Sequence, residues 1–126
     1  MNFPADLYYT KDHEWLRVDG PSAYIGVTDY AQSELGDVVF VQLPPVGTTL
    51  KQRQSFGTIE AVKAVTDIYA PASGPIIEIN KNLEKSPESV NKDPYGAGWM
   101  LKITLNDPGE MKNLLTVEQY KALIGK

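Results

Sequence analysis

The segment that most constrains the fold runs from Gly57 to Gly74, with the sequence GTIEAVKAVTDIYAPASG. Two β-prone runs, Ser55 to Val62 and Val65 to Tyr69, flank Lys63, and the turn sequence PASG follows the second run. This order predicts a β-hairpin with Lys63 at its crest. The immediate neighbours of Lys63 are small or apolar and carry no charge, so a modifying enzyme could reach the ammonium group without breaking an ion pair.

Composition fits one globular domain that spans residues 1–126. The chain is 42% hydrophobic and 22% charged, and 126 residues can bury roughly two thirds of the unfolded surface in a core. The formal net charge of -4 argues against nucleic acid or an anionic membrane as a partner. The N-terminus lacks the pattern of a signal peptide, and no apolar run is long enough for a membrane span. We therefore expect a monomeric protein of the cytoplasm.

Short strands separated by turn residues are predicted along most of the chain. Residues 23–28 place their apolar side chains on one face, and residues 99–105 alternate, with Met100 on the polar face. The run from Val38 to Leu43 is apolar on both faces, which predicts a central strand. Another strand is predicted from Ile76 to Asn80, after the PASG turn. These patterns indicate a β-rich sandwich or barrel.

One short helix is predicted between the early strands, from Asp29 to Leu35. Thr28 precedes this segment as an N-cap, and Gly36 is placed to end it.

The C-terminal segment carries the other helical signals. A helix is predicted to begin near Pro108, because an aspartate precedes this first-turn proline. Thr116 and Gln119 have the spacing of a capping box, and Tyr120 and Leu123 follow on the apolar face of a second helix.

The chain has no motif that would assemble a catalytic site of its own. It contains no cysteine, no G-x-S-x-G, no H-E-x-x-H and no phosphate-binding loop, so any sulfur chemistry has to arrive on a cofactor. The single histidine, His13, stands among carboxylates, but one histidine with adjacent acids is more often structural than a metal ligand. We assign no metal and expect a non-catalytic protein.

The lysine hairpin resembles a known family. The run IEAVKAVTDIYAPASG is similar to the lipoyl-lysine segment of glycine cleavage system H proteins. The resemblance covers the chain from Tyr8 to Leu123 in the family's order and spacing, through three further blocks: DHEW at residues 12–15, IGVTDYAQSELGDVVFVQLP at 25–44 and VNKDPYGAGWM at 90–100.

The resemblance implies a fold, a cofactor and a set of partners. The implied fold is mainly β, a flattened barrel-sandwich hybrid of two antiparallel sheets with a lipoyl-lysine hairpin, short helices and a C-terminal helical segment. Lipoate would be joined to Lys63 by an amide, through a lipoate ligase or a lipoyl/octanoyl transferase. The carrier would take an aminomethyl group from the P protein (glycine decarboxylase) to the T protein (aminomethyltransferase), and the L protein (dihydrolipoyl dehydrogenase) would reoxidise it. These steps belong to glycine catabolism and one-carbon metabolism.

The resemblance also points to acidic residues near the loaded arm. Glu14 of the DHEW block and Asp67 of the lysine hairpin would line a cleft that holds a protonated amine, and Glu34 of the short helix is a further candidate. Glu14 and Asp67 could equally be ordinary surface acids, and for Glu34 the sequence favours that alternative.

Other lysine carriers fit the sequence less well. Biotin carriers resemble Met-Lys-Met at the modified lysine, and lipoyl domains of 2-oxo acid dehydrogenases resemble Asp-Lys-Ala, whereas this chain has Val-Lys-Ala at residues 62–64. Two alternatives stay open: an H-like protein that relays lipoyl groups to other enzymes, and a module that binds partners without modification.

Overall fold

The computed structural model describes residues 1–126 of the chain. It contains nine strands, four short α-helices and one 3₁₀ helix, η1. In chain order the elements are β1 (Tyr8–Tyr9), β2 (Glu14–Asp19), β3 (Ser22–Val27), α1 (Asp29–Leu35), β4 (Val38–Gln42), β5 (Thr49–Leu50), β6 (Ser55–Ala61), β7 (Val65–Tyr69), β8 (Gly74–Ile79), α2 (Asn82–Lys85), α3 (Ser89–Lys92), β9 (Leu101–Thr104), η1 (Pro108–Asn113) and α4 (Val117–Leu123).

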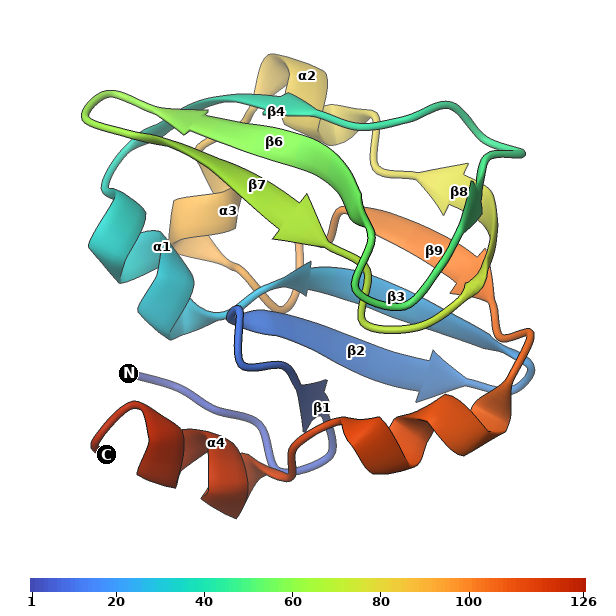
Figure 1. The fold of residues 1–126 in the computed structure, drawn as a ribbon. Helices are drawn as coiled ribbons and strands as arrows, with labels where there is room; N and C mark the ends of the chain where they lie inside the picture. The colour runs from blue at the N-terminus through green and yellow to red at the C-terminus, as the bar shows by residue number, and fades with distance from the viewer.

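The strands form two sheets that pack face to face. One sheet has six strands in the order β1-β2-β3-β9-β8-β5, the other has three in the order β4-β6-β7, and every pair is antiparallel. In Figure 1 the three-stranded sheet lies above β2, β3 and β9, and α1 lies below the β6–β7 loop on the same side of the molecule. The predicted mainly β, two-sheet architecture is confirmed, and the sheets do not close into a complete barrel.

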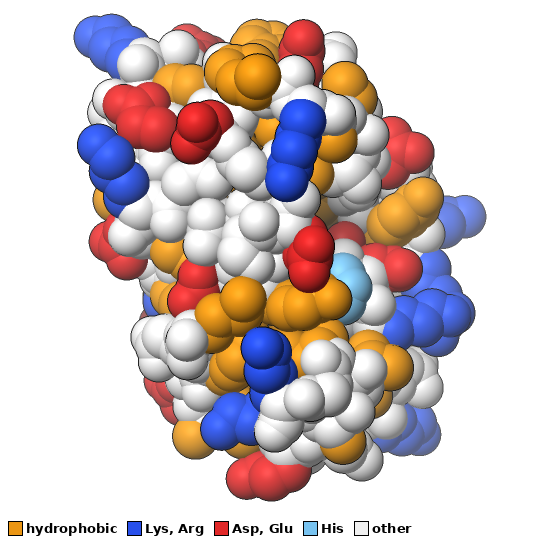
Figure 2. Space-filling model, turned by 90° about the vertical axis from the view of Figure 1, so that its left-hand side faces the viewer, with side chains coloured by type: hydrophobic (Ala, Val, Ile, Leu, Met, Phe, Trp, Pro, Cys, Tyr) orange, Lys and Arg blue, Asp and Glu red, His pale blue; other side chains and the backbone are white.

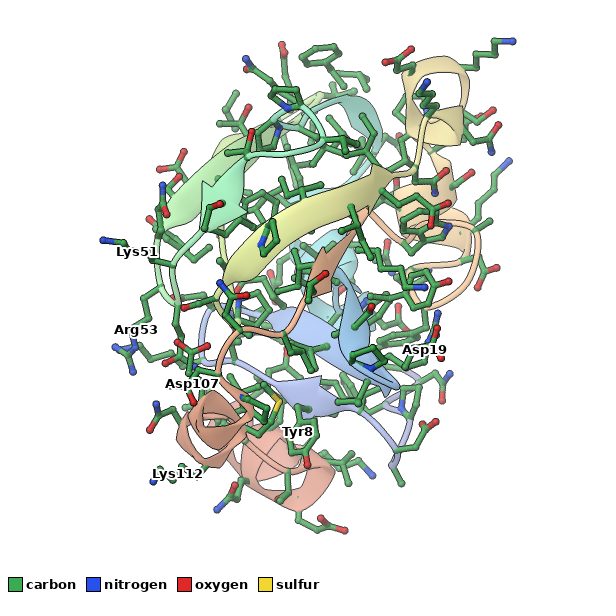
Figure 3. All side chains as sticks on the ribbon, turned by 90° about the vertical axis from the view of Figure 1, so that its right-hand side faces the viewer. Tyr8, Asp19, Lys51, Arg53, Asp107 and Lys112 are labelled. Atoms are coloured by element: carbon green, nitrogen blue, oxygen red, sulfur yellow. The ribbon has the colours of Figure 1, made fainter.

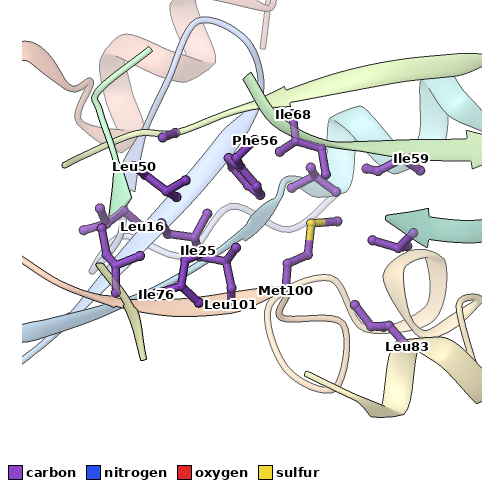
Figure 4. Close-up of a cluster of buried hydrophobic side chains, with 14 of the residues drawn as sticks. Leu16, Ile25, Leu50, Phe56, Ile59, Ile68, Ile76, Leu83, Met100 and Leu101 are labelled. Carbon is purple, nitrogen blue, oxygen red and sulfur yellow. The ribbon is translucent and has the colours of Figure 1, made fainter. Parts of the chain in front are cut away.

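The main core lies between the two sheets and contains 18 buried hydrophobic residues. Figure 4 shows Ile25 and Leu101 from the six-stranded sheet facing Phe56, Ile59 and Ile68 from the three-stranded sheet. A second cluster of five buried residues joins the N-terminal segment to α4, with Tyr9 stacked on Tyr120 at a ring-centroid distance of 4.8 Å. The two clusters fix the lysine hairpin on one side and the C-terminal helix on the other.

The strand predicted from Val38 to Leu43 is present as β4, but its predicted central position is wrong, because β4 is an edge strand of the three-stranded sheet. Its register with β6 shifts between Val38 and Phe40, so that Val38 and Val41 turn inward while Phe40 stays 50% exposed. The run looks apolar on both faces because one set of its side chains is buried and the other lies on the outer surface.

Two predictions of side-chain burial are also wrong. Met100 was expected on a polar face, but it is fully buried, since it precedes β9 and donates its backbone N–H to the Ile25 carbonyl at 2.8 Å. The sequence places Leu123 on the apolar face of the second helix, but it is 54% exposed, because α4 packs on the second cluster through Val117 and Tyr120.

The predicted helix boundaries are confirmed where capping side chains define them. Thr28 accepts a hydrogen bond from the Ala31 N–H at the start of α1, and Gly36 ends that helix with φ 79°. The capping box of Thr116 and Gln119 is present at α4. The segment that begins at Pro108 is helical, but it forms a 3₁₀ helix.

Candidate functional site

Lys63 lies at the crest of the hairpin between β6 and β7. The turn is closed by a backbone hydrogen bond from the Ala61 N–H to the Ala64 carbonyl at 2.7 Å. The strands below it pair in regular register from Glu60 back to Gly57, and the register shifts only farther away, between Ser55 and Gly57. Lys63 is exposed and forms no salt bridge, and the nearby Val62 and Val65 are 76% and 68% exposed. The result is a primary amine on a rigid support, with only apolar neighbours at the turn.

A cavity of about 250 Å³ lies beside α1, between the start of β2 and strand β7. The three acidic residues singled out in the sequence, Glu14, Glu34 and Asp67, all line it. Figure 2 shows the face of the molecule where the pale-blue histidine side chain lies between acidic side chains and a hydrophobic area. The cavity therefore combines an apolar lining with several carboxyl groups, which suits a ligand that has an apolar stem and a cationic end.

Glu14 differs from the other two acids because it is buried, with only 2% of its surface exposed. Its carboxyl group accepts hydrogen bonds from the Thr10 hydroxyl at 2.5 Å and from the Tyr69 N–H at 3.2 Å. Burial raises the pKa of Glu14 to about 8, although these two hydrogen bonds act in the opposite direction. At neutral pH this carboxyl group is largely protonated, and a cation placed beside it would favour the loss of its proton.

His13 has a structural connection that links the cavity to the C-terminal helix. Its Nδ1 atom lies 2.9 Å from the Tyr120 hydroxyl, which also lies 2.8 Å from the Thr28 hydroxyl. Burial lowers the pKa of His13, against the opposing effects of Asp12 and Glu34. The neutral imidazole therefore belongs to a hydrogen-bonded network at one end of the cavity.

A smaller cavity of about 120 Å³ lies on another side of Glu14, near the end of β7 and η1. Arg53, which has the unusual φ of 74°, contributes to its lining. Figure 3 shows Lys51 and Arg53 pointing away from the fold on the same side of the molecule as Lys112 of η1. No residue of the lysine hairpin crest lines this cavity, so it lies apart from Lys63.

Sequence reasoning missed several residues that line the larger cavity. Tyr30 lies one helical turn before Glu34 on α1, and Thr66 precedes Asp67 on β7. The four-residue spacing between Tyr30 and Glu34 could have indicated a shared helix face. Thr66 carried no comparable signal, because a strand residue next to Asp67 is expected on the opposite face.

The two-sheet fold, with an exposed lysine at the crest of a hairpin, is that of a carrier domain. A family model described as "Glycine cleavage H-protein" matches residues 7–126. The chain therefore belongs to the glycine cleavage H-protein family. This membership implies a lipoate-bearing carrier subunit of the glycine cleavage system.

Individual relatives agree with the family match along the whole chain. The chain is 57% identical to the glycine cleavage system H protein of Chlorobium luteolum, over 99% of both chains. It is 52% identical to that of Geobacillus kaustophilus, over 100% of this chain and 99% of the relative. The crystal structure of a glycine cleavage system H protein from Mycobacterium marinum superposes with a TM-score of 0.91 at 41% identity, covering 98% of this chain and all of the other.

None of the helices combines the length and the apolar character that a membrane-spanning segment needs.

Proposed function

We propose that this chain carries lipoate in amide linkage on Lys63 and takes an aminomethyl group from the P protein to the T protein of the glycine cleavage system. Reoxidation by the L protein completes the cycle. The observation that carries the proposal is the exposed, unpaired Lys63 on a hairpin beside a cavity lined by four carboxyl groups, those of Asp12, Glu14, Glu34 and Asp67. Lipoate, when bound, supplies a disulfide that can be reduced and reoxidised.

The residues at the crest fit such an attachment. Lys63 is accessible to a lipoate ligase or a lipoyl/octanoyl transferase, and amide formation would break no ion pair. The turn itself is held by a backbone hydrogen bond that does not involve the lysine side chain. The arm could therefore move while its attachment point stays recognisable to several enzymes.

The carboxyl groups of the larger cavity suit the cargo of this cycle. We propose that Glu14, Asp67 and Glu34 hold the protonated amine end of the cargo and limit its contact with water. Buried Glu14 would respond most strongly, because a neighbouring cation offsets the cost of its ionisation. Asp67 and Glu34 are exposed and would contribute weaker, screened attractions.

The remaining parts of the proposal follow from the role of a carrier. The chain would act as one monomeric lipoyl-carrier domain, residues 1–126, in the cytoplasm. Its partners would perform the chemistry, so this chain would be a non-catalytic subunit. The support for this part is the family membership and a set of site residues suited to binding cargo.

Intact mass spectrometry tests the attachment. The purified chain is incubated with a lipoate ligase, lipoate and ATP, and the same reaction is run with Lys63→Arg. Arginine keeps the positive charge but cannot form this amide, so the mass gain should occur only in the parent chain. A mass gain that persists in Lys63→Arg would overturn the assignment of the site.

Reconstitution tests the glycine role separately. Lipoylated chain, P protein, glycine and labelled bicarbonate should exchange the carboxyl carbon of glycine, whereas unmodified chain should not. A lipoylated chain that supports no exchange, yet donates its lipoyl group to another protein, would favour the relay alternative. Full exchange with unmodified chain would favour a binding module that needs no cofactor.

A further inference from the structure

The crest of the lysine hairpin rests on the segment Gly36–Val38, which joins α1 to β4 and is called here the support segment. The Val62 N–H donates to the Asp37 carbonyl at 3.0 Å, so the residue just before Lys63 is tied to this segment. In Figure 1 the β6–β7 loop lies above the connection from α1 to β4. The contact links Lys63 to a part of the chain more than 20 residues away.

The side chain of Lys63 also lies on the support segment. A methyl group built at Gly36 would stand 3.1 Å from Cε of Lys63, 3.7 Å from Cδ and 3.8 Å from Nζ. Because Gly36 has no side chain, the aliphatic stem of Lys63 can lie against its backbone. Leu35, the residue before Gly36, lines the larger cavity, so the stem lies close to one edge of that cavity.

The support segment is in turn held by Asn91 of α3. The Asn91 carboxamide accepts a hydrogen bond from the Val38 N–H at 2.9 Å and donates to the Gly36 carbonyl at 2.8 Å. It also donates to Oε1 of Gln32 on α1 at 3.1 Å. One side chain therefore fixes the backbone on both sides of Asp37, the residue whose carbonyl holds the crest.

We propose that Asn91 is a positioning residue for the Lys63 arm. It acts through the support segment, which anchors the crest at Val62 and seats the lysine stem over Gly36. The inference concerns where the arm starts and which way it leaves the protein. It rests on the proposed function only in that Lys63 is the residue to be modified.

The chain offers a matched control in Asn80. Its carboxamide also makes three hydrogen bonds, to the Ala97 and Trp99 carbonyls and from the Asn82 N–H, but it touches neither the crest nor the support segment. Asn91→Ala and Asn80→Ala therefore each remove three hydrogen bonds from an asparagine. Only Asn91→Ala is expected to affect Lys63.

The first measurement is amide hydrogen exchange of the unmodified protein. In Asn91→Ala the Val62 amide should exchange about tenfold faster than in the parent, because its acceptor is no longer held in place. In Asn80→Ala the change should stay below about twofold. Equal acceleration of Val62 in the two variants, or none in Asn91→Ala, would overturn the proposal.

The second measurement reports on the lysine itself. After reductive methylation with ¹³C-formaldehyde, the Lys63 signal is identified by its absence in Lys63→Arg. This signal should shift and sharpen in Asn91→Ala and stay in place in Asn80→Ala. Should Asn91→Ala fail to fold, Asn91→Asp serves instead, since it keeps the acceptor for Val38 and loses the donor to Gly36.

Lipoylation gives a third readout that separates the two proposals. With a lipoate ligase, kcat/KM for Asn91→Ala should fall roughly three- to tenfold below that of Asn80→Ala. An equal kcat/KM in the two variants would contradict the positioning role. A parent chain that takes up no lipoate at all would instead defeat the proposed function, while the exchange and ¹³C measurements would still decide the role of Asn91.

Discussion

Lys63 at the hairpin crest and Glu14, the buried acid of the larger cavity and here called its floor, lie in opposite environments. Lys63 at the crest is exposed and has no charged partner, whereas Glu14 is 2% exposed and accepts two hydrogen bonds. A residue that an enzyme is to modify has to be accessible to that enzyme. A carboxylate that is to hold a cation attracts it more strongly where water is excluded. The comparison indicates that the proposed attachment residue and the proposed cargo-binding residue lie in different environments and can be altered independently.

The largest expected effect is at the crest. Lys63→Arg should abolish lipoylation completely and leave the free energy of unfolding within about 0.5 kcal/mol of the parent, because the side chain is exposed and unpaired. Intact mass and urea denaturation measure the two quantities. A loss of several kcal/mol in stability would show that the crest is not independent of the rest of the fold.

At the cavity floor, Glu14 should make stability depend on pH. Its folded-state pKa is raised from 4.5 to about 8, so the folded protein binds more protons than the unfolded chain between these values. Stability should therefore be highest below pH 4.5 for this group and should fall as pH rises toward 8. Glu14→Gln should remove this fall and be more stable than the parent at pH 9 by a few kcal/mol.

Urea denaturation at pH 5 and pH 9 checks this prediction. The difference between Glu14→Gln and the parent should grow with pH, whereas Asp67→Asn, at an exposed position of the same cavity, should change stability by less than about 0.5 kcal/mol at both values. A constant difference for Glu14→Gln would mean that Glu14 is ionised in the folded protein.

The sequence predicted the hairpin at the crest better than the buried environment of Glu14 at the floor, for a physical reason. The hairpin, the Thr28 cap and the capping box at Thr116 depend on residues within a few positions of one another, so local patterns suffice. Glu14 accepts a hydrogen bond from the Tyr69 N–H, 55 residues away, and the hydrogen bond from Val38 to Asn91 spans 53 residues. Such contacts arise from the pairing of distant segments and leave no local pattern in a single sequence.

The errors have the same origin. Val38 to Leu43 has the composition of a central strand, but the bulge in β4 and its edge position put Phe40 at the surface. Strands β1 and β5, with two residues each, are too short to give a periodic signal.

A smaller effect is expected at the hydrogen-bonded end of the cavity. Tyr120→Phe should destabilise the protein by about 1–3 kcal/mol, because the buried Thr28 hydroxyl and the His13 ring both lose a partner. Tyr8→Phe is the control, since Tyr8 is half-buried and its hydroxyl forms no hydrogen bond with the protein. Equal melting temperatures for Tyr120→Phe and Tyr8→Phe would show that this hydrogen-bonded network does not contribute to stability.

The smallest effect should come from Asp67, an exposed acid of the cavity. An exposed carboxylate attracts a cation by about 0.2–1 kcal/mol, which corresponds to a change of roughly 1.4- to fivefold in a rate. Asp67→Asn should therefore raise the rate at which the loaded protein loses its aminomethyl group to water by a factor in this range, and Glu14→Gln should raise it more. Release of formaldehyde and ammonia from loaded protein gives the rate, with Glu78→Gln, an exposed acid outside the cavity, as the control. If Asp67→Asn raised the rate of aminomethyl loss as much as Glu14→Gln or more, solvent exposure would not determine how strongly these two carboxyl groups protect the cargo.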